Sequence, residues 1–287
     1  MTQPPQPTNR DVRVTWIGHA TTQIDYGHFR VLTDPLLRRR VAHLRRRCEL
    51  PSPSIAEADL VLLSHAHMDH LHVRSLRRID PTTPVVAPRG TRPLLTRVGF
   101  ERIIEVEPGD RVEVGPATID TVDAAHPAGR GPHSKIRARP VGFVIEVAGH
   151  RTYFAGDTDL FDGMGSLGSI DVALLPIWGW GPSIGRGHLD PRRATEATAL
   201  IRPRAVIPIH WGTYSPEDGR LIPPTWLDSP ANSFVSEMRS AGYANRLQLL
   251  QPGQAFEVGP GVIGRAWKRS RGERGSLVVG SNPIIRE

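Results

Sequence analysis

Apolar and polar residues alternate along the first part of the chain. The alternation runs through residues 11–17, 22–26 and 29–33, and Gly27 and His28 separate the last two segments. Because the side chains of a strand point to opposite faces in turn, this pattern predicts successive antiparallel strands. Gly27 and His28 are expected to form a hairpin turn between two of them.

Short apolar runs and helical patterns alternate in the rest of the chain. Strands are predicted at residues 59–63, 85–87, 102–106, 111–114, 118–122, 141–147, 151–155, 171–176 and 205–209, and near Leu247 and Ala255. Helices are predicted at residues 72–79, near 93–95, at 191–197 and at 231–240. This rhythm favours one layered α/β domain. We place it at residues 11–257, between a disordered start at 1–10 and a flexible basic tail at 258–287.

Two aspartates are expected to begin helices. Asp190 directly precedes Pro191, and proline is favoured at the first position of a helix. Asp159 follows the strand at 151–155 and is expected to be a helix N-cap. His72 is expected to lie on the surface of the helix at 72–79.

The segment from Ser64 to His70 carries the strongest chemical signal. It reads Ser-His-Ala-His-Met-Asp-His and directly follows the apolar strand at 59–63. Neutral imidazoles and carboxylates are the ligands that zinc and its neighbours prefer, so a metal site explains this composition better than a solvated histidine-rich loop. His65 and His67 are expected to project to one side of the turn. Asp69 and His70 can then address a second metal position close by.

The pattern His65-x-His67-x-Asp69-His70 resembles the signature of the metallo-β-lactamase-fold hydrolases. The resemblance implies a four-layer αββα sandwich of the α/β class, with the metals at one end of the sheets. It also implies three further ligands downstream, in the order His, Asp, His, each at the end of a strand. His126, Asp157 and His210 match these positions. His133, in the flexible loop after His126, is the rival third ligand.

The resemblance implies two divalent metal ions, which we expect to be zinc. His65, His67 and His126 would bind the first metal, and Asp69, His70 and His210 the second. Asp157 would bridge them. Two cations that share a water molecule lower its pKa and stabilise the oxyanion that forms during hydrolysis.

Three further segments narrow the resemblance to one branch of the superfamily. Residues 18–21 read Gly-His-Ala-Thr, residues 187–191 contain Gly-His before Pro191, and residues 209–213 read Ile-His-Trp-Gly-Thr. They are similar to N-acylphosphatidylethanolamine-type phospholipase D enzymes and ascorbate-phosphate-type lactonases. This similarity implies phosphodiester hydrolysis as the favoured activity and lactone opening as the second choice. The class with a His-Cys second site does not match, because the single cysteine, Cys48, lies outside the pattern.

Four residues around the expected metals are candidates for contact with substrate. The resemblance places His188 near a substrate phosphate, as a binding residue or proton donor, and Asp69 could also orient the nucleophile. His19 either supports a metal ligand by hydrogen bonding or contacts the substrate. Trp178 and Trp180 lie on a glycine-rich loop beyond a strand, where they either line the mouth of a pocket or anchor the loop by packing.

The positive net charge of the chain does not decide which partners the protein binds. The formal net charge is +7, and Lys135 and Lys268 are the only lysines beside many arginines. Six arginines lie between Arg38 and Arg47. They are either solvated surface or an arm that binds phosphate or an anionic surface, consistent with a phospholipid-like phosphodiester substrate. A nuclease acting on RNA or DNA is the less favoured alternative, and a non-enzymatic metal-stabilised binding protein is the third. No oligomeric state is predicted.

Several classes of protein are not favoured by the composition. One cysteine cannot form an intrachain disulfide, which fits a reducing compartment. Residues 1–10 lack the apolar core of a signal peptide, and no run approaches the ~18 apolar residues of a membrane span. We therefore expect a soluble cytoplasmic protein.

Overall fold

A seven-stranded sheet forms one half of the molecule. The computed structural model describes residues 12–131, 134–179, 184–216 and 227–259. The sheet has the order β16-β1-β2-β3-β6-β7-β8. Its strands are β1 (Val12–Gly18), β2 (Thr21–Asp25), β3 (Arg30–Thr33), β6 (Leu60–Leu62), β7 (Val85–Pro88), β8 (Ile103–Val106) and β16 (Ala255–Val258). β1, β2 and β3 pair antiparallel, as the alternation predicts. β3, β6, β7 and β8 pair in parallel.

A six-stranded sheet forms the other half. Its order is β14-β13-β12-β11-β10-β9. β9, β10, β11 and β12 pair antiparallel, and β12, β13 and β14 pair in parallel. The strands are β9 (Arg111–Val114), β10 (Ala117–Asp123), β11 (Val141–Val147), β12 (His150–Phe154), β13 (Val172–Pro176) and β14 (Ala205–Ile209). All of them lie where apolar runs predict strands.

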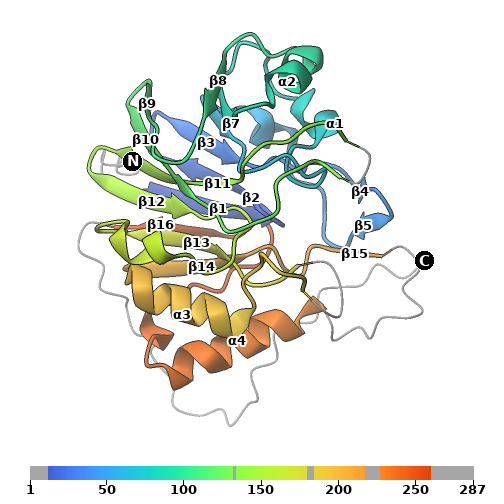
Figure 1. Ribbon diagram of the computed structural model, residues 1–287. Coiled ribbons are helices and arrows are strands. Elements are labelled where there is room, and N and C mark those ends of the chain that lie inside the picture. The colour runs from blue at the N-terminus through green and yellow to red at the C-terminus, as the bar shows by residue number, and fades with distance from the viewer. Residues whose placement is uncertain (1–11, 132–133, 180–183, 217–226, 260–287) are drawn as a thin grey trace, which may run out of the picture.

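Helices cover the outer faces of both sheets. α1 (Val73–Leu76) and α2 (Arg92–Val98) pack on the first sheet, and α3 (Pro191–Ile201) and α4 (Ser229–Ser240) lie against the second (Figure 1). Between the sheets lies an apolar core that includes Trp16, Phe143 and Phe154. The four layers form the αββα sandwich that the resemblance implies. Within the described ranges, no helix has the length and apolarity needed to cross a bilayer.

The arginine-rich stretch folds into a third, small sheet. β4 (Arg40–Val41), β5 (Leu44–Arg46) and β15 (Tyr214–Pro216) pair in the order β15-β5-β4. Five of the six arginines are exposed, but Arg46 is buried and donates to the Ile17 carbonyl at 2.5 Å. The predicted arm is therefore partly structural, because one guanidinium joins this sheet to the end of β1.

Some local predictions are confirmed and others are wrong. Asp190 is the N-cap of α3, where its side chain accepts from the Arg193 amide at 2.8 Å. Asp159 caps no helix, because its carboxylate is paired with Arg193 at 2.5 Å and the next 3₁₀ helix (Asp162–Ser166) begins after Phe161. Two other short 3₁₀ helices among the described residues are Pro53–Ala56 and Ala244–Arg246.

The regions near α1 and near the end of the chain also differ from prediction. α1 is shorter than the predicted helix, and half-buried His72 is its N-cap rather than a surface residue. Leu247 makes a single bridge to Val206 instead of starting a strand, because a 3₁₀ helix directly precedes it. The predicted terminal segments, 1–10 and the basic tail after β16, lie outside the described residues, apart from the first residues of the tail.

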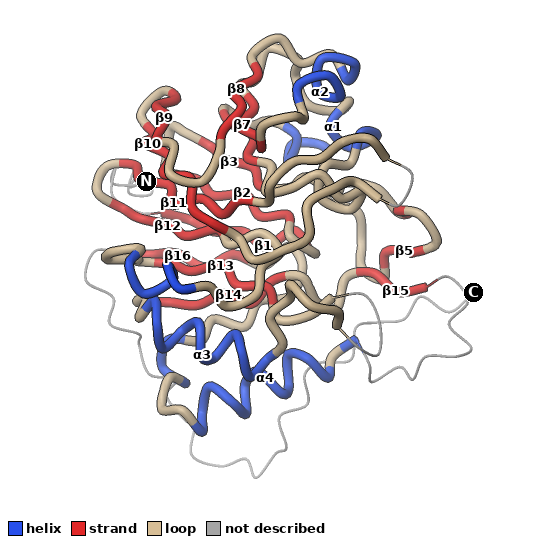
Figure 2. The backbone as a smooth tube through the Cα atoms, in the orientation of Figure 1, coloured by secondary structure: helices blue, strands red, loops and turns tan. Residues whose placement is uncertain are grey.

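The ends of strands from both sheets meet at one edge of the sandwich. Figure 2 shows long loops gathering at this edge. β1 and β6 of the first sheet, and β10, β12 and β14 of the second, lead directly to residues predicted as ligands or as their support.

Candidate metal centre

The first predicted ligand set is brought together in space. His65 and His67 lie in residues 64–71, which we call the ligand loop, and His126 follows β10 in the opposite sheet. His67 Nδ1 lies 2.9 Å from His65 Nε2 and 3.1 Å from His126 Nε2. Three ring nitrogens from two sheets therefore converge on one position.

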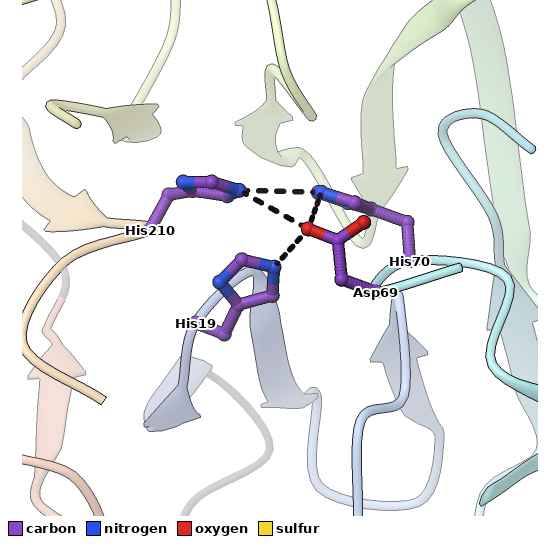
Figure 3. Close-up of side chains that lie close together, drawn as sticks. All are labelled: His19, Asp69, His70 and His210. Carbon is purple, nitrogen blue, oxygen red and sulfur yellow. Dashed lines mark hydrogen bonds and ion pairs between the residues drawn. The ribbon is translucent and has the colours of Figure 1, made fainter. Parts of the chain in front are cut away.

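The second predicted set forms a neighbouring cluster. His70 Nε2 lies 3.3 Å from His210 Nε2, and the Asp69 carboxylate lies 3.5 Å from His70 Nε2. His19, at the end of β1, joins this cluster, because its Nε2 lies 3.0 Å from Asp69 Oδ2 (Figure 3). From this position His19 can support Asp69 by hydrogen bonding, which is one of its two predicted roles.

Asp157 lies between the two clusters. One carboxylate oxygen is 3.3 Å from His70 Nε2 and 3.9 Å from His65 Nε2, and the other is 3.2 Å from His210 Nε2. The residue follows β12 and is only 3% exposed. Its position between the sets is the one that the sequence predicts for a bridging carboxylate.

Two backbone carbonyls fix the tautomers of ligands from the second sheet. His126 Nδ1 donates to the Gly187 carbonyl at 2.7 Å, and His210 Nδ1 donates to the Trp178 carbonyl at 2.8 Å. A neutral imidazole has one donor and one acceptor nitrogen. In both residues the acceptor is therefore Nε2, which faces the cluster.

A buried carboxylate, Asp34, fixes the ligands of the first sheet. It accepts the Ser64 hydroxyl at 2.5 Å and His70 Nδ1 at 2.6 Å. Because the Ser64 hydroxyl donates to Asp34, it can accept from His65 Nδ1, which lies 2.9 Å away. His65 and His70 thus also turn Nε2 inward. Sequence reasoning missed Asp34, and the only signal in the sequence was its position directly after the strand predicted at 29–33.

The donor set fits divalent cations. Burial and then the charge of His70 hold the pKa of His65 well below its usual value, and burial lowers the pKa of His126 to about 4. These two imidazoles are therefore neutral, the form in which an imidazole can bind a cation. Burial opposes ionisation of Asp157, but His210 and His70 hold its pKa well below the usual value.

Two further observations indicate that this position attracts positive charge. Burial opposes protonation of His70, but Asp157, Asp69 and Asp34 together raise its pKa well above the usual value. Asp157 Oδ1 is buried and accepts no hydrogen bond from the described residues. Buried polar atoms are normally satisfied, and a cation bound by inward-facing nitrogens and carboxylates would satisfy this one.

The candidate substrate residues surround this centre. His188 Nε2 lies 3.5 Å from the Asp157 carboxylate, and the His188 side chain is 20% exposed. Trp178 lines a small pocket that also contains His19 and His210. Trp180 and His133 lie outside the described residues.

Gly156 allows the two sheets to approach each other at the centre. Its φ angle is +60°, and a Cβ atom there would overlap the side chain of Ser64. Any other residue would push Asp157 away from the ligand loop, so the glycine is required by close packing as well as by backbone conformation.

Comparison with known proteins agrees with this geometry. A family model described as a beta-lactamase superfamily domain matches residues 29–211. The chain belongs to the metallo-β-lactamase superfamily. The matched segment of this superfamily member contains all the predicted metal ligands.

Relatives of this metallo-β-lactamase superfamily member cover most of its length. A UPF0173 metal-dependent hydrolase from Methanopyrus kandleri is 30% identical over 86% of this chain and 100% of its own. Another, from Nitratidesulfovibrio vulgaris, is 34% identical over 70% of this chain and 81% of its own. The solved structure of Igni18, a metallo hydrolase from Ignicoccus hospitalis, has a TM-score of 0.62 at 25% identity and covers 86% of this chain and 98% of its own.

Proposed function

We propose that this metallo-β-lactamase superfamily member is a hydrolase that uses two divalent cations, zinc ions, to cleave a phosphodiester. The observation that carries the proposal is the position of Asp157, which lies within 4 Å of ligand nitrogens in both clusters. Two cations bound there would activate a water molecule as the nucleophile and stabilise the charge that develops on the substrate. The relatives named metal-dependent hydrolases support the same reaction class.

The carboxylates and His188 have separate roles in this proposal. Asp157 lies between the two ligand clusters and would bind a cation in each. Asp69 lies at the edge of the second cluster with its side chain 16% exposed, where it can orient the attacking water and accept its proton. His188 lies on a different loop with its Nε2 3.5 Å from the Asp157 carboxylate, and this nitrogen can donate a proton to the leaving oxygen.

Positive charge beside the centre favours a phosphodiester over a neutral substrate. Exposed Arg38, Arg39, Arg40, Arg45 and Arg47 belong to or flank the small sheet, whose strand β15 begins four residues after His210. Guanidinium groups bind phosphate well. We therefore propose a phospholipid-like or other small phosphodiester, with these arginines touching its charged group or an anionic surface.

The test is hydrolysis by zinc-reconstituted protein of a chromogenic phosphodiester and of a simple lactone. Wild type is expected to turn over the diester, and Asp157→Ala is expected to abolish turnover. Asp120→Ala is a matched control, because Asp120 is paired with Arg111 on the surface, in the same sheet but outside the centre. It should retain full activity.

The outcomes separate the alternatives. Diester turnover lost only in Asp157→Ala supports the proposal, and the enzyme is then assayed on phospholipids and on RNA over a salt series. Strong salt dependence with RNA would favour a nuclease. Lactone turnover without diester turnover would replace the phosphodiesterase proposal with a lactonase. Bound zinc with neither activity would overturn the proposed substrate class.

A further inference from the structure

One arginine from the second half of the molecule donates to two carbonyls of the ligand loop, one in its first half and one at its end. Arg130 lies in the loop after His126, and its Nη1 donates to the Ala66 carbonyl at 3.0 Å and to the Leu71 carbonyl at 2.9 Å. These two carbonyls bracket His67, Asp69 and His70. One guanidinium nitrogen thus joins the two points between which these ligands lie.

The hydrogen bonds occur where the backbone is shielded from water. Ala66 and Leu71 are fully buried, and the Arg130 side chain is half-buried. A buried carbonyl that loses its donor is left unsatisfied at a cost in free energy, so the hydrogen bonds from Arg130 stabilise this backbone arrangement. Within the loop, the amide groups of His70 and Leu71 both donate to the His67 carbonyl. The loop therefore has its own turn, and Arg130 joins a carbonyl before this turn to one at its end.

The charge of Arg130 argues against an electrostatic benefit to metal binding. Burial lowers the pKa of the guanidinium, and the nearby Asp69 carboxylate opposes that shift, which places the cation beside a ligand of the second cluster. A positive charge there repels a bound metal. In the described part of the chain, no ion pair of Arg130 with a carboxylate is found. Among the described residues its hydrogen-bond partners are the Ala66 and Leu71 carbonyls.

We propose that Arg130 is a positioning residue that pre-organises the ligand loop for metal binding. By spanning Ala66 and Leu71 from the loop that also carries His126, it couples the geometry of both ligand clusters. The inference rests on the metal binding of the proposed function, but it does not depend on the substrate.

The sign of the effect on zinc affinity distinguishes positioning from charge. Arg130→Met removes both hydrogen bonds and the positive charge. If Arg130 positions the ligands, the zinc dissociation constant should rise roughly tenfold or more, the size seen when groups that orient metal ligands are lost. If its charge dominates, the same variant should bind zinc more tightly. Affinity is measured at neutral pH by competition with a chromogenic chelator, using the full-length chain.

Arg137→Met is the matched control. Arg137 is in the same loop and carries the same charge, but the described residues to which its Nη1 donates are Ser134 and Ile136 of that loop, through their carbonyls at 2.7 and 3.1 Å. Its zinc affinity should equal that of wild type. Arg130→Lys retains a charge and a donor without the guanidinium fork, so its affinity should lie between those of wild type and Arg130→Met.

A second readout does not involve metal. In chelator-treated protein, amide hydrogen exchange in residues 66–72 should be faster in Arg130→Met than in wild type or Arg137→Met. Zinc affinity and loop exchange unchanged in both Arg130 variants would overturn the inference, and tighter zinc binding by Arg130→Met would do the same. If wild type itself bound no zinc, the proposed function would fail, but the exchange measurement would still show whether Arg130 orders the loop. The failure of the proposed function and the failure of this inference are therefore distinguishable.

Discussion

Each imidazole around Asp157 is oriented by the hydrogen bond on its other nitrogen. The partners differ: Asp34 for His70, the Gly187 carbonyl for His126 and the Trp178 carbonyl for His210. Asp34 is distinct because it is charged, fully buried and shared with Ser64. One carboxylate thereby orients His70 directly and His65 through the serine hydroxyl.

Asp34→Asn should weaken metal binding. Asp34 accepts from the Ser64 backbone amide on one oxygen and from the Ser64 hydroxyl and His70 Nδ1 on the other. An amide has only one acceptor oxygen, so its NH2 group would face a donor on one side, and the His70 tautomer is no longer fixed. We expect zinc affinity to fall by about 10–100-fold, measured by chelator competition. Asp25→Asn, at the far end of β2, is the control. Equal affinities for wild type and both variants would show that Asp34 does not support the ligands.

His188→Gln should lower kcat and leave the zinc content unchanged. Loss of a proton donor costs about 10²–10⁴-fold, but only where the leaving oxygen needs a proton. Two substrates therefore make the test: a diester with a nitrophenolate leaving group, which is stable as an anion, and one with an alkoxide leaving group. The alkoxide substrate should lose far more activity. Equal losses on both substrates would assign His188 to binding instead.

At the scale of elements, the sequence predicted what depends on local pattern and missed what depends on pairing across the chain. Alternation and apolar runs located the strands of both large sheets. Asp34 was missed because Ser64 and His70 reach it only through the parallel pairing of β3 with β6, which brings together segments 30 residues apart. The small third sheet was missed because its strands are short and two of them are rich in arginine. α1 is shorter than predicted because the amides of Arg78 and Ile79 donate to carbonyls three residues back, which are turns and not α-helical hydrogen bonds.

The start of α2 illustrates such a distant contact. Its N-cap residue, Thr91, makes no capping hydrogen bond with its side chain. Glu105 of β8 accepts instead from the amides of Gly90 at 2.7 Å and Arg92 at 3.0 Å. Burial opposes ionisation of Glu105, but these amides and the Arg92 guanidinium hold its pKa below the usual value of 4.5.

Glu105→Gln should therefore destabilise the protein at neutral pH and less so in acid. A carboxyl group whose pKa is lower in the folded state contributes stability above its unfolded pKa, and that contribution disappears as pH falls through the folded pKa. We expect a loss of about 1 kcal/mol at pH 7, typical of a helix cap. The difference should shrink as pH falls below 4.5. Urea unfolding with chelator present measures it.

The control for Glu105→Gln is Glu113→Gln, on the exposed surface of β9. It should leave the free energy of unfolding unchanged at both pH values. A Glu105→Gln variant whose deficit is the same at neutral and acid pH would mean that charge does not stabilise the start of α2.

At the scale of the whole molecule, the metal centre links the two halves of the sandwich. The ligand loop belongs to the first sheet, whereas His126, Asp157 and His210 follow strands of the second. Gly156 lets the residues of the second sheet approach the ligand loop closely, and Arg130 of the second half of the molecule donates a hydrogen bond to that loop. Metal bound between the clusters would therefore hold the sheets together, and its binding energy would add to the stability of the whole fold.

Removal of metal should accordingly lower the melting temperature of the entire domain in one transition. Free zinc at 100 times its dissociation constant stabilises the folded state by about 2.7 kcal/mol for one site. Thermal unfolding is compared in excess zinc and in chelator, for wild type and for Asp157→Ala. The zinc-dependent increase should be large in wild type and much smaller in the variant, because Asp157 contacts ligands from both sheets. An equal increase in both proteins would place the stabilising zinc elsewhere, and no increase in wild type would mean that the sheets are held by their apolar core alone.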